Sequence, residues 1–209
     1  VAFTPTASGN YVFTGTSTLT GCTSSSSIHI QVNSCSGTPG AALHFDANDY
    51  VNLTSAVTNS LVGQNKLTVE AWVKPNLGSN GRVIIGNYST VGNNSMQFLL
   101  RVWQNQYYQF FIGNGAVGTY TSVNSSIAPV NGAWTHVAGV WDGTVAAIYV
   151  NGIASGTINA ALPSLPSFTA PVFIGGNTIN ENFSGPIDEV RIWTTARTRC
   201  EINTYRNCE

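Results

Sequence analysis

The chain has 209 residues, a formal net charge of −1 and 8% charged side chains, against roughly 25% in an average soluble domain. This length fits one ordinary domain, or one domain with a fragment of another, and the charge balance gives no indication of a nucleic-acid partner. No apolar run approaches the roughly 18 residues that a membrane-spanning helix needs, so we expect no membrane insertion.

The N-terminal segment differs in composition from the rest of the chain. It begins without an initiator Met or a signal peptide, so we expect a processed product or an excised piece. Its Ser/Thr-rich sequence holds at most two strands, around "NYVFTGT" and "IHIQV", which predicts one hairpin. A lone hairpin is marginally stable in water and must pack on, or complete, something else. We place a linker at residues 34–40 and predict two domains, at residues 1–34 and 35–209.

Short runs of alternating polarity fill the chain after the linker. In order they are "ALHFD", "YVNL", "LTVEAWVKP", "RVIIGN", "MQFLLRVW", "YYQFFIG", "THVAGVWD", "AAIYVNG", "VFIGGN" and "IDEVRIW". Clusters of Gly, Asn, Ser and Pro separate them, which is typical of an antiparallel sandwich. Hairpin turns are predicted at residues 104–106 and at Asp142-Gly143, the latter a strong turn signal. Only "TTARTRCEINTYRN" could form a terminal helical turn.

The hairpin around residues 98–111 contains the candidate ligand-binding residues. Alternation places Arg101 and Trp103 on one face of the first strand, and Tyr107 and Gln109 on one face of the next. Across the turn these four side chains could form one amphipathic patch, with aromatic rings to stack on sugar C–H faces and planar donors to bond hydroxyl groups. The alternative is structural, because aromatic pairs across neighbouring strands are ordinary stabilisers of a sheet.

The strand at residues 185–193 begins with two adjacent carboxylates. Strict alternation would put Asp188 on the same face as Val190 and Ile192. A carboxylate on an aliphatic face needs hydrogen bonds, a cation or a metal ion. Asp188 could therefore lock the strand by accepting backbone amides or pairing with Arg191 or Arg197, or it could bind a metal.

Four cysteines, Cys22, Cys35, Cys200 and Cys208, flank a long middle that has none. Zinc-type spacing is absent, and the even count in a low-charge β sequence indicates disulfides and an extracellular, secreted or cell-surface protein. A Cys22–Cys35 bond within one straight strand is disfavoured, because about 3.3 Å per residue far exceeds the roughly 5.5 Å Cα separation of a disulfide. Cys22 would then pair elsewhere, either in this chain or in another one, and a Cys200–Cys208 loop is one of the open pairings.

Four motifs, in this order, resemble laminin-G-like domains of the concanavalin A-like lectin/glucanase group. They are "ALHFDANDYVNL", "LTVEAWVKP", "WTHVAGVWDGTVAAIYVNG" and "FSGPIDEVRIWTTARTRCEI", and together they cover roughly residues 38–202. The resemblance implies an all-β, antiparallel two-sheet jelly-roll sandwich whose first and last strands are adjacent. Residues 8–33 resemble the last two strands of a bacterial immunoglobulin-like repeat.

The resemblance also implies a metal site and a disulfide. If the end strands pair, Asp46 and Asp49 would lie near Asp188, and such oxygen ligands suit Ca²⁺ as a cofactor. Leu43–Phe45 would pair near Asp188–Trp193, and a Cys35–Cys200 bond would then be reasonable.

The resemblance to this family also indicates which function to expect. Related glucanases carry catalytic carboxylates at positions i and i+4 with a third between them, and no E-x-D-x-x-E pattern occurs here. We therefore expect a non-catalytic binding or adhesion module of a bacterial surface or secreted protein, with a glycan or an extracellular protein as partner. The alternative is a filament subunit that self-associates by donating its N-terminal hairpin to a neighbour. Excision from a longer protein would explain the same hairpin.

Overall fold

The computed structural model of this chain describes residues 9–16, 23–30, 42–78, 82–89, 95–114, 116, 118–176 and 181–206. The chain divides into two compact units, an N-terminal one that contains the hairpin and a second one that spans Pro39–Asn207. The predicted linker at residues 34–40 lies outside the described residues. Among the described helices, none has the length and apolar character needed to cross a membrane.

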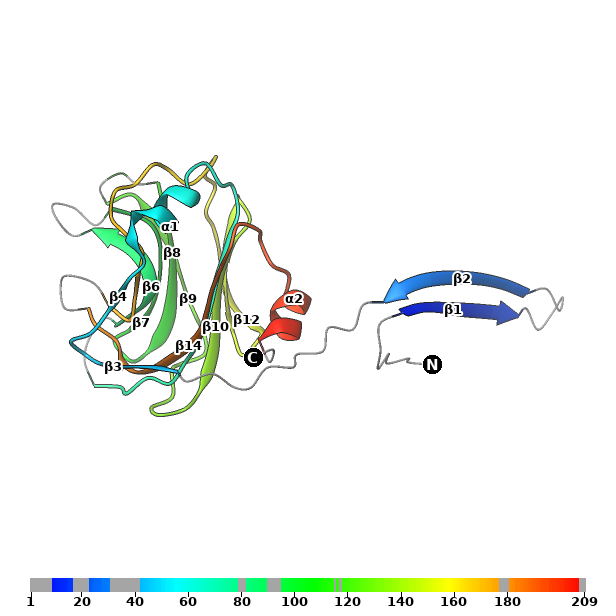
Figure 1. Ribbon diagram of the computed structural model, residues 1–209, viewed down its shortest axis with the longest axis horizontal. Coiled ribbons are helices and arrows are strands. Elements are labelled where there is room, and N and C mark those ends of the chain that lie inside the picture. The colour runs from blue at the N-terminus through cyan, green and yellow to red at the C-terminus, as the bar shows by residue number, and fades with distance from the viewer. Residues whose placement is uncertain are drawn as a thin grey trace. The chain divides into compact units, whose positions relative to one another are not determined.

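The N-terminal unit contains the predicted hairpin. Strands β1 (Gly9–Thr16) and β2 (Thr23–Ile30) pair antiparallel in continuous register and form a two-stranded sheet of their own (Figure 1). The hairpin is therefore confirmed, whereas its likeness to an immunoglobulin repeat stays a prediction.

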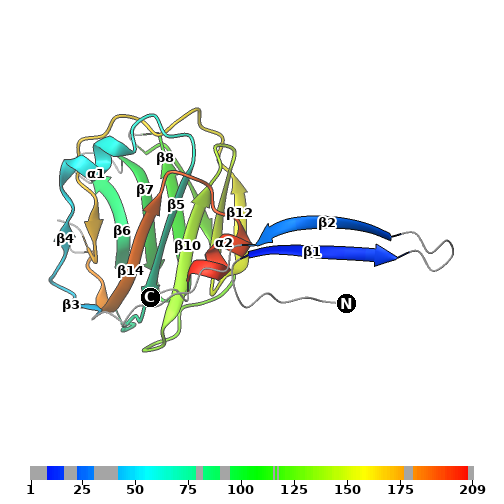
Figure 2. The same cartoon turned by 45° about the vertical axis from the view of Figure 1, so that its right-hand side comes forward.

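The second unit is a sandwich of two six-stranded antiparallel sheets, which Figures 1 and 2 show as two layers. The first sheet has the order β12-β11-β10-β5-β14-β3, with strands at Ile153–Asn159, Val145–Val150, Thr135–Trp141, Leu67–Val73, Ser184–Trp193 and Leu43–Asp46. The second sheet has the order β4-β13-β6-β7-β8-β9, with strands at Val51–Asn52, Phe173–Ile174, Arg82–Ser89, Ser95–Trp103, Tyr107–Gly113 and Tyr120–Asn124. The predicted all-β jelly-roll sandwich is confirmed.

The core lies between the two sheets and follows from the two-residue alternation of the strands. Each sheet contributes alternate side chains that are fully buried, among them Leu67, Val69, Ala71 and Val73 from β5 and Phe98, Leu100 and Val102 from β7. The layers approach so closely at Gly139 of β10 that an added Cβ would lie 2.3 Å from the ring of Phe110 in β8. This glycine is thus required by packing between the sheets.

Both predicted turns join neighbouring strands. Asp142 and Gly143 connect β10 to β11, where the Asp142 carboxylate accepts hydrogen bonds from the backbone amides of Thr144 (2.9 Å) and Val145 (2.8 Å). Gly143 has φ 100°, a conformation that L-residues with side chains avoid. The turn between β7 and β8 has positive φ angles at Gln104 and Asn105. These local signals fix the register of the two hairpins.

The first and last strands of the sandwich are neighbours, as the resemblance implied. The register differs from the expected one, because Leu43–Asp46 pairs with the beginning of β14, Ser184–Ile187, rather than with Asp188–Trp193. On its other edge β14 pairs with β5, from Ile187 to Trp193. Strand β3 is short and begins at Leu43, opposite Ile187, so it does not extend along the later part of β14.

A β-bulge in β14 changes the faces expected for Asp188 and its neighbours. The register against β5 shifts between Asp188 and Arg191, and Glu189 has φ 50°. One extra residue in a strand exchanges the faces of all residues beyond it. Val190 and Ile192 consequently pack against the core, whereas Asp188 lies on the opposite, outer face. The prediction that Asp188 shares a face with these two aliphatic residues is therefore wrong.

The described part of this unit also contains two short helices. Helix α1 (Thr54–Ser60) lies at one end of the sandwich, and α2 (Arg199–Tyr205) lies against the outer face of the first sheet in both views (Figures 1 and 2). A capping box between Thr198 and Glu201 starts α2. Ile202 then packs against Ala138 and Val140 of β10. The terminal helical turn expected from the sequence is confirmed.

Candidate functional site

The four predicted ligand-binding residues come together on the outer face of the second sheet. Strands β7 and β8 pair so that Arg101 lies opposite Gln109 and Trp103 lies opposite Tyr107. The amphipathic patch is thus present as a structural feature, because alternation gives each pair a common face. Ligand binding by these residues stays a prediction.

Arg101 is held in place from several sides. Its guanidinium carbon lies 3.8 Å from the ring centroid of Trp103 and 4.7 Å from that of Phe111. Its Nε donates a hydrogen bond to Gln109 Oε1 (3.0 Å), and its Nη1 lies 3.5 Å from Glu181 Oε1. Burial lowers the pKa of Arg101, while the charge of Glu181 acts in the opposite direction. The arginine therefore organises the surrounding side chains as much as it offers its own charge.

A cleft of about 240 Å³ opens beside this arginine. It is lined by Tyr88, Met96, Leu99, Arg101, Trp103, Phe111, Tyr120 and Glu181. Only two of these residues, Arg101 and Trp103, were predicted. Tyr88 comes from β6, Tyr120 from β9 and Glu181 from the segment before β14, so only the order of strands in the sheet brings them here.

The walls of the cleft combine aromatic surface with polar groups. Tyr120 is 41% exposed and meets Phe111 edge to face, with 5.3 Å between ring centroids. Burial, followed by the charge of Glu181, raises the pKa of Tyr88, so its hydroxyl stays protonated at neutral pH and can donate a hydrogen bond. Such a surface can stack on the apolar face of a planar or ring-shaped ligand and bond its hydroxyl groups.

The lining contains one carboxylate, Glu181. Most glycosidases place two carboxyl groups on either side of the scissile bond. The described part of the cleft therefore resembles a binding site more than a hydrolytic one.

The predicted calcium ligands do not meet at one point. The side chains of Asp46 and Asp49 hydrogen-bond to each other, which raises the pKa of Asp46. Asp46 pairs with Ser184, four residues before Asp188, a separation of roughly 13 Å along a strand. Among the residues that the structure describes, no three Asp, Glu, His or Cys side chains lie close enough together to hold a metal ion. The three-carboxylate site is therefore not formed.

Asp188 instead has the structural role that was considered beside metal binding, because it accepts a hydrogen bond from a backbone amide. Its Oδ1 accepts a hydrogen bond of 2.8 Å from the backbone amide of Glu189, the bulged residue. This contact stabilises the local turn of the backbone on the outer face. Asp188 is thus matched by a backbone amide, one of the partners considered from the sequence.

Of the four cysteines, only Cys200 lies within the described residues. It is an exposed, free thiol at the second position of α2. Cys22, Cys35 and Cys208 lie outside the described residues. The free thiol of Cys200 disagrees with the predicted Cys35–Cys200 and Cys200–Cys208 bonds, neither of which is formed in this structure.

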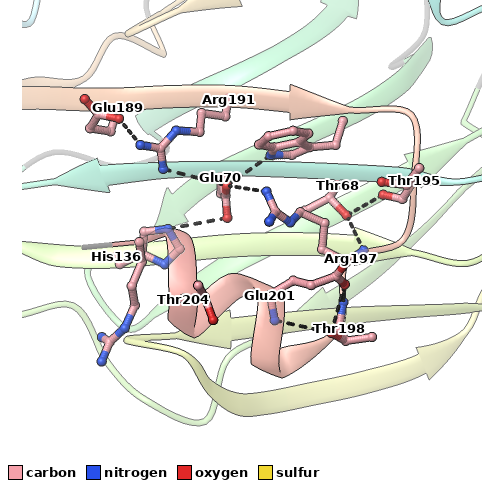
Figure 3. Close-up of polar contacts among 12 residues, drawn as sticks. Thr68, Glu70, His136, Glu189, Arg191, Thr195, Arg197, Thr198, Glu201 and Thr204 are labelled. Atoms are coloured by element: carbon pink, nitrogen blue, oxygen red, sulfur yellow. Dashed lines mark hydrogen bonds and ion pairs between the residues drawn. The ribbon is translucent and has the colours of Figure 1, made fainter. Parts of the chain in front are cut away.

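A second cluster of polar side chains lies on the outer face of the first sheet, under α2 (Figure 3). Its centre is Glu70 of β5, whose side chain is fully buried. Trp193 Nε1 donates a hydrogen bond to Glu70 Oε1 at 3.0 Å. The guanidinium groups of Arg197 and Arg191 approach the same oxygen, with Nη1 at 3.8 and 3.9 Å. The bulge in β14 makes this possible, because it places Arg191 directly opposite Glu70.

His136 of β10 borders the same cluster. Its Nε2 lies 3.6 Å from Glu70 Oε2, which is too long for a hydrogen bond. Burial, together with the positive charges of Arg206 and Arg191, lowers the pKa of His136 to about 3. The imidazole is therefore neutral at physiological pH, and its contact with Glu70 is not an ion pair.

The C-terminal segment covers this cluster. Trp72 Nε1 donates a hydrogen bond of 2.6 Å to the backbone carbonyl of Arg206, and the Trp72 ring meets His136 edge to face. Arg197 stacks over Trp193 at 4.1 Å. These contacts hold α2 against the first sheet. The residues around Glu70, which we call the Glu70 cluster, are Trp193, Arg191, Arg197 and His136, and they were not identified from the sequence.

Comparison with known proteins supports the fold. Residues 45–203 match a laminin G family model described as the concanavalin A-like lectin/glucanases superfamily. A putative carbohydrate binding protein from Bacteroides ovatus is 20% identical, with a TM-score of 0.61, over 96% of this chain and 57% of that one. The CBM40 of the Ruminococcus gnavus IT-sialidase, solved with α2,3-sialyllactose, is 16% identical, with a TM-score of 0.62, over 79% of this chain and 95% of that one.

Curated relatives share only a short region with this chain. Pappalysin-1 from Mus musculus is 27% identical over 99 residues, which is 46% of this chain. The match spans 6% of the length of that protein. A similar match is found in Pappalysin-1 from Homo sapiens.

Proposed function

The chain belongs to the concanavalin A-like lectin/glucanase superfamily, and we propose on this basis that it is a non-catalytic carbohydrate-binding module. The proposed binding site is the cleft beside Arg101 on the outer face of the second sheet. The presence of a single carboxylate in the cleft supports a binding role over hydrolysis.

One observation above all supports the proposal: Arg101 stacks on the ring of Trp103 while it bonds Gln109. This arrangement fixes the rotamers of a large aromatic side chain and of a planar amide on a rigid sheet. A site whose groups are already ordered loses less entropy when a ligand binds. Sugars offer apolar C–H faces and hydroxyl groups together, which matches this combination of surfaces.

The names of two structural neighbours agree with this proposal. One is called a putative carbohydrate binding protein, and the other was solved with α2,3-sialyllactose. Their identity to this chain is low, so the argument for a glycan rests on the cleft itself.

A glycan array probed with the full chain and three variants tests the proposal. Trp103→Ala should weaken binding at least tenfold, because it removes an aromatic wall of the cleft. Tyr107→Ala should have a smaller effect, since Tyr107 lies beside the lining. Trp134→Ala, which removes an exposed tryptophan just before β10 of the other sheet, is the matched control and should bind normally. Equal binding by Trp103→Ala and the parent would remove this cleft from the proposal.

We also infer that the protein works outside the cell, either secreted or at the cell surface, where an adhesive role would bring it into contact with glycans. The low charge and the even number of cysteines support this location. Intact-mass analysis of the native protein under non-reducing conditions, with thiol alkylation, tests it. At least one disulfide is expected, and four alkylated thiols would contradict the inference.

A filament subunit is the second candidate function. The observation that favours it is the hairpin β1–β2, a two-stranded sheet of its own, since an unpaired strand edge can add to a neighbouring sheet. Sedimentation velocity should then show growing assemblies for residues 1–209 and a monomer for residues 35–209. The idea fails if both forms remain monomeric as the concentration rises.

A further inference from the structure

We propose that the cleft beside Arg101 selects neutral saccharides and rejects acidic ones. This inference rests on the proposed glycan-binding function and specifies its ligand class. Among the described residues that line the cleft, Arg101 is the one cation and Glu181 the one anion. The formal charge of the lining is therefore zero, and the two groups already face each other at 3.5 Å.

The geometry of Arg101 leaves no edge of its guanidinium group open for a paired contact with a carboxylate. A guanidinium holds a carboxylate best through two parallel hydrogen bonds, from Nε with one terminal nitrogen or from both terminal nitrogens. Here Nε donates to Gln109 and Nη1 faces Glu181, so each of these edges contains an engaged nitrogen. The rings of Trp103 and Phe111 occupy positions over the guanidinium plane. An acidic sugar would have to displace Gln109 or Glu181 to form the paired contact.

Displacement of Glu181 would be unfavourable because the site is poorly solvated. The side chains of Arg101 and Glu181 are only 12% and 19% exposed. An acidic sugar would place a second negative charge next to Glu181, and the two carboxylates would compete for Arg101. Like charges brought together, or a partly buried charge left unpaired, weaken an interface strongly.

A neutral sugar can bind without displacing Gln109 or Glu181 and without adding a negative charge to the cleft. A carboxylate offers roughly four acceptor positions, so Glu181 can accept from sugar hydroxyl groups while it keeps its contact with Arg101. Trp103 and the half-exposed Tyr120 supply apolar ring surface beside these polar groups. The cleft volume of about 240 Å³ is below the roughly 300–1,000 Å³ of pockets that enclose drug-sized ligands. We therefore assign it a single neutral ring, such as a terminal hexose, with the rest of the glycan in solvent.

The test is a printed array in which each neutral glycan is paired with its sialylated and its uronic-acid counterpart, probed with the full chain. Acidic counterparts should bind at least tenfold more weakly than the neutral glycans that the chain recognises. Glu181→Gln keeps the size of the side chain and removes its charge, so it should reduce this preference at least fivefold. Glu201→Gln removes a charge in α2, which lies against the other sheet, and Gln keeps the capping interaction, so the preference should not change.

The outcomes separate this inference from the function on which it rests. Acidic glycans that bind as well as, or better than, their neutral counterparts would overturn the selectivity and leave glycan binding intact. A preference that Glu181→Gln and Glu201→Gln alter equally would overturn the role of Glu181. A folded chain that binds no glycan of either kind would overturn the proposed function and this inference together.

Discussion

Lowering the pH from 7 to 5 should destabilise this protein, mainly through His136. The imidazole is buried on the outer face of the first sheet, and two nearby arginines, Arg191 and Arg206, add positive charge to its surroundings. Its pKa in the folded protein is about 3, against 6.5 for an ordinary histidine. Between these values the unfolded chain binds a proton that the folded chain does not, so acid favours unfolding.

The size of the effect follows from the difference in pKa. Stability that is fully present above the unfolded pKa of 6.5 falls by about 1.4 kcal/mol for each pH unit, until the pH reaches the folded pKa. At pH 5 the loss is about 2 kcal/mol relative to pH 7. For a domain of this size such a loss lowers the melting temperature by about 4–8 °C.

Urea denaturation at a series of pH values between 7 and 5 measures this dependence. His136→Gln removes the titrating group, so it should flatten the slope of unfolding free energy against pH by about 2 kcal/mol over this range. His44→Gln, which removes an exposed imidazole in β3, is the matched control for the loss of a histidine, and the flattening should be specific to His136→Gln. If His136 instead formed an ion pair with Glu70, acid would stabilise the protein. A parent-like slope in His136→Gln, or a gain in stability at pH 5, would refute the reasoning.

Three further changes test other parts of the structure. Glu70→Gln should cost about 3–5 kcal/mol in urea denaturation, because it removes the buried carboxylate that faces Arg197 and Arg191, while Arg191 keeps its contact with the partly exposed Glu189. Gly139→Ala should cost about 1–3 kcal/mol by the same assay, since the new methyl group meets the ring of Phe110. Thr198→Ala should cost about 1 kcal/mol through loss of the α2 cap, and amide hydrogen exchange should rise first in α2.

Local signals in the sequence were sufficient for the strands and hairpins, whereas the two-sheet jelly-roll with adjacent end strands was implied by the family resemblance. Alternating polarity identifies each strand, and Asp142-Gly143 identifies one hairpin without reference to the rest of the chain. The patch at Arg101 and Trp103 was predictable for the same reason, since both strands belong to one hairpin.

The rest of the cleft depends on contacts between segments far apart in the chain. Tyr88, Tyr120 and Glu181 reach Arg101 only because β6 and β9 flank the β7–β8 hairpin and because β14 begins nearby. No alternation within one strand carries this information. The Glu70 cluster was missed for a similar reason, since α2 folds back over β5 and β10.

The bulge in β14 explains why strict alternation failed. In an unbroken register, Val190 would lie opposite Glu70 on the outer face and Arg191 would lie opposite Val69 in the core. The bulge inserts one residue between Asp188 and Arg191, so that Val190 packs inward and Arg191 faces Glu70. The positive φ of Glu189 costs about 1–3 kcal/mol, far less than a buried unpaired arginine.

Two deletions distinguish this explanation from a bulge that merely fills space. Without Glu189, β14 would pair regularly with β5 while Val190 and Arg191 kept their faces. Arg191 would lose its partly exposed partner Glu189, so the loss of stability should be about 1 kcal/mol. Without Val190, Glu189 would face the core opposite Ala71, and the loss should exceed about 3 kcal/mol because a charge replaces an aliphatic side chain. Urea denaturation of both variants measures the difference. Equal destabilisation would show that the sequence places its extra residue for a reason other than the faces of Val190 and Arg191.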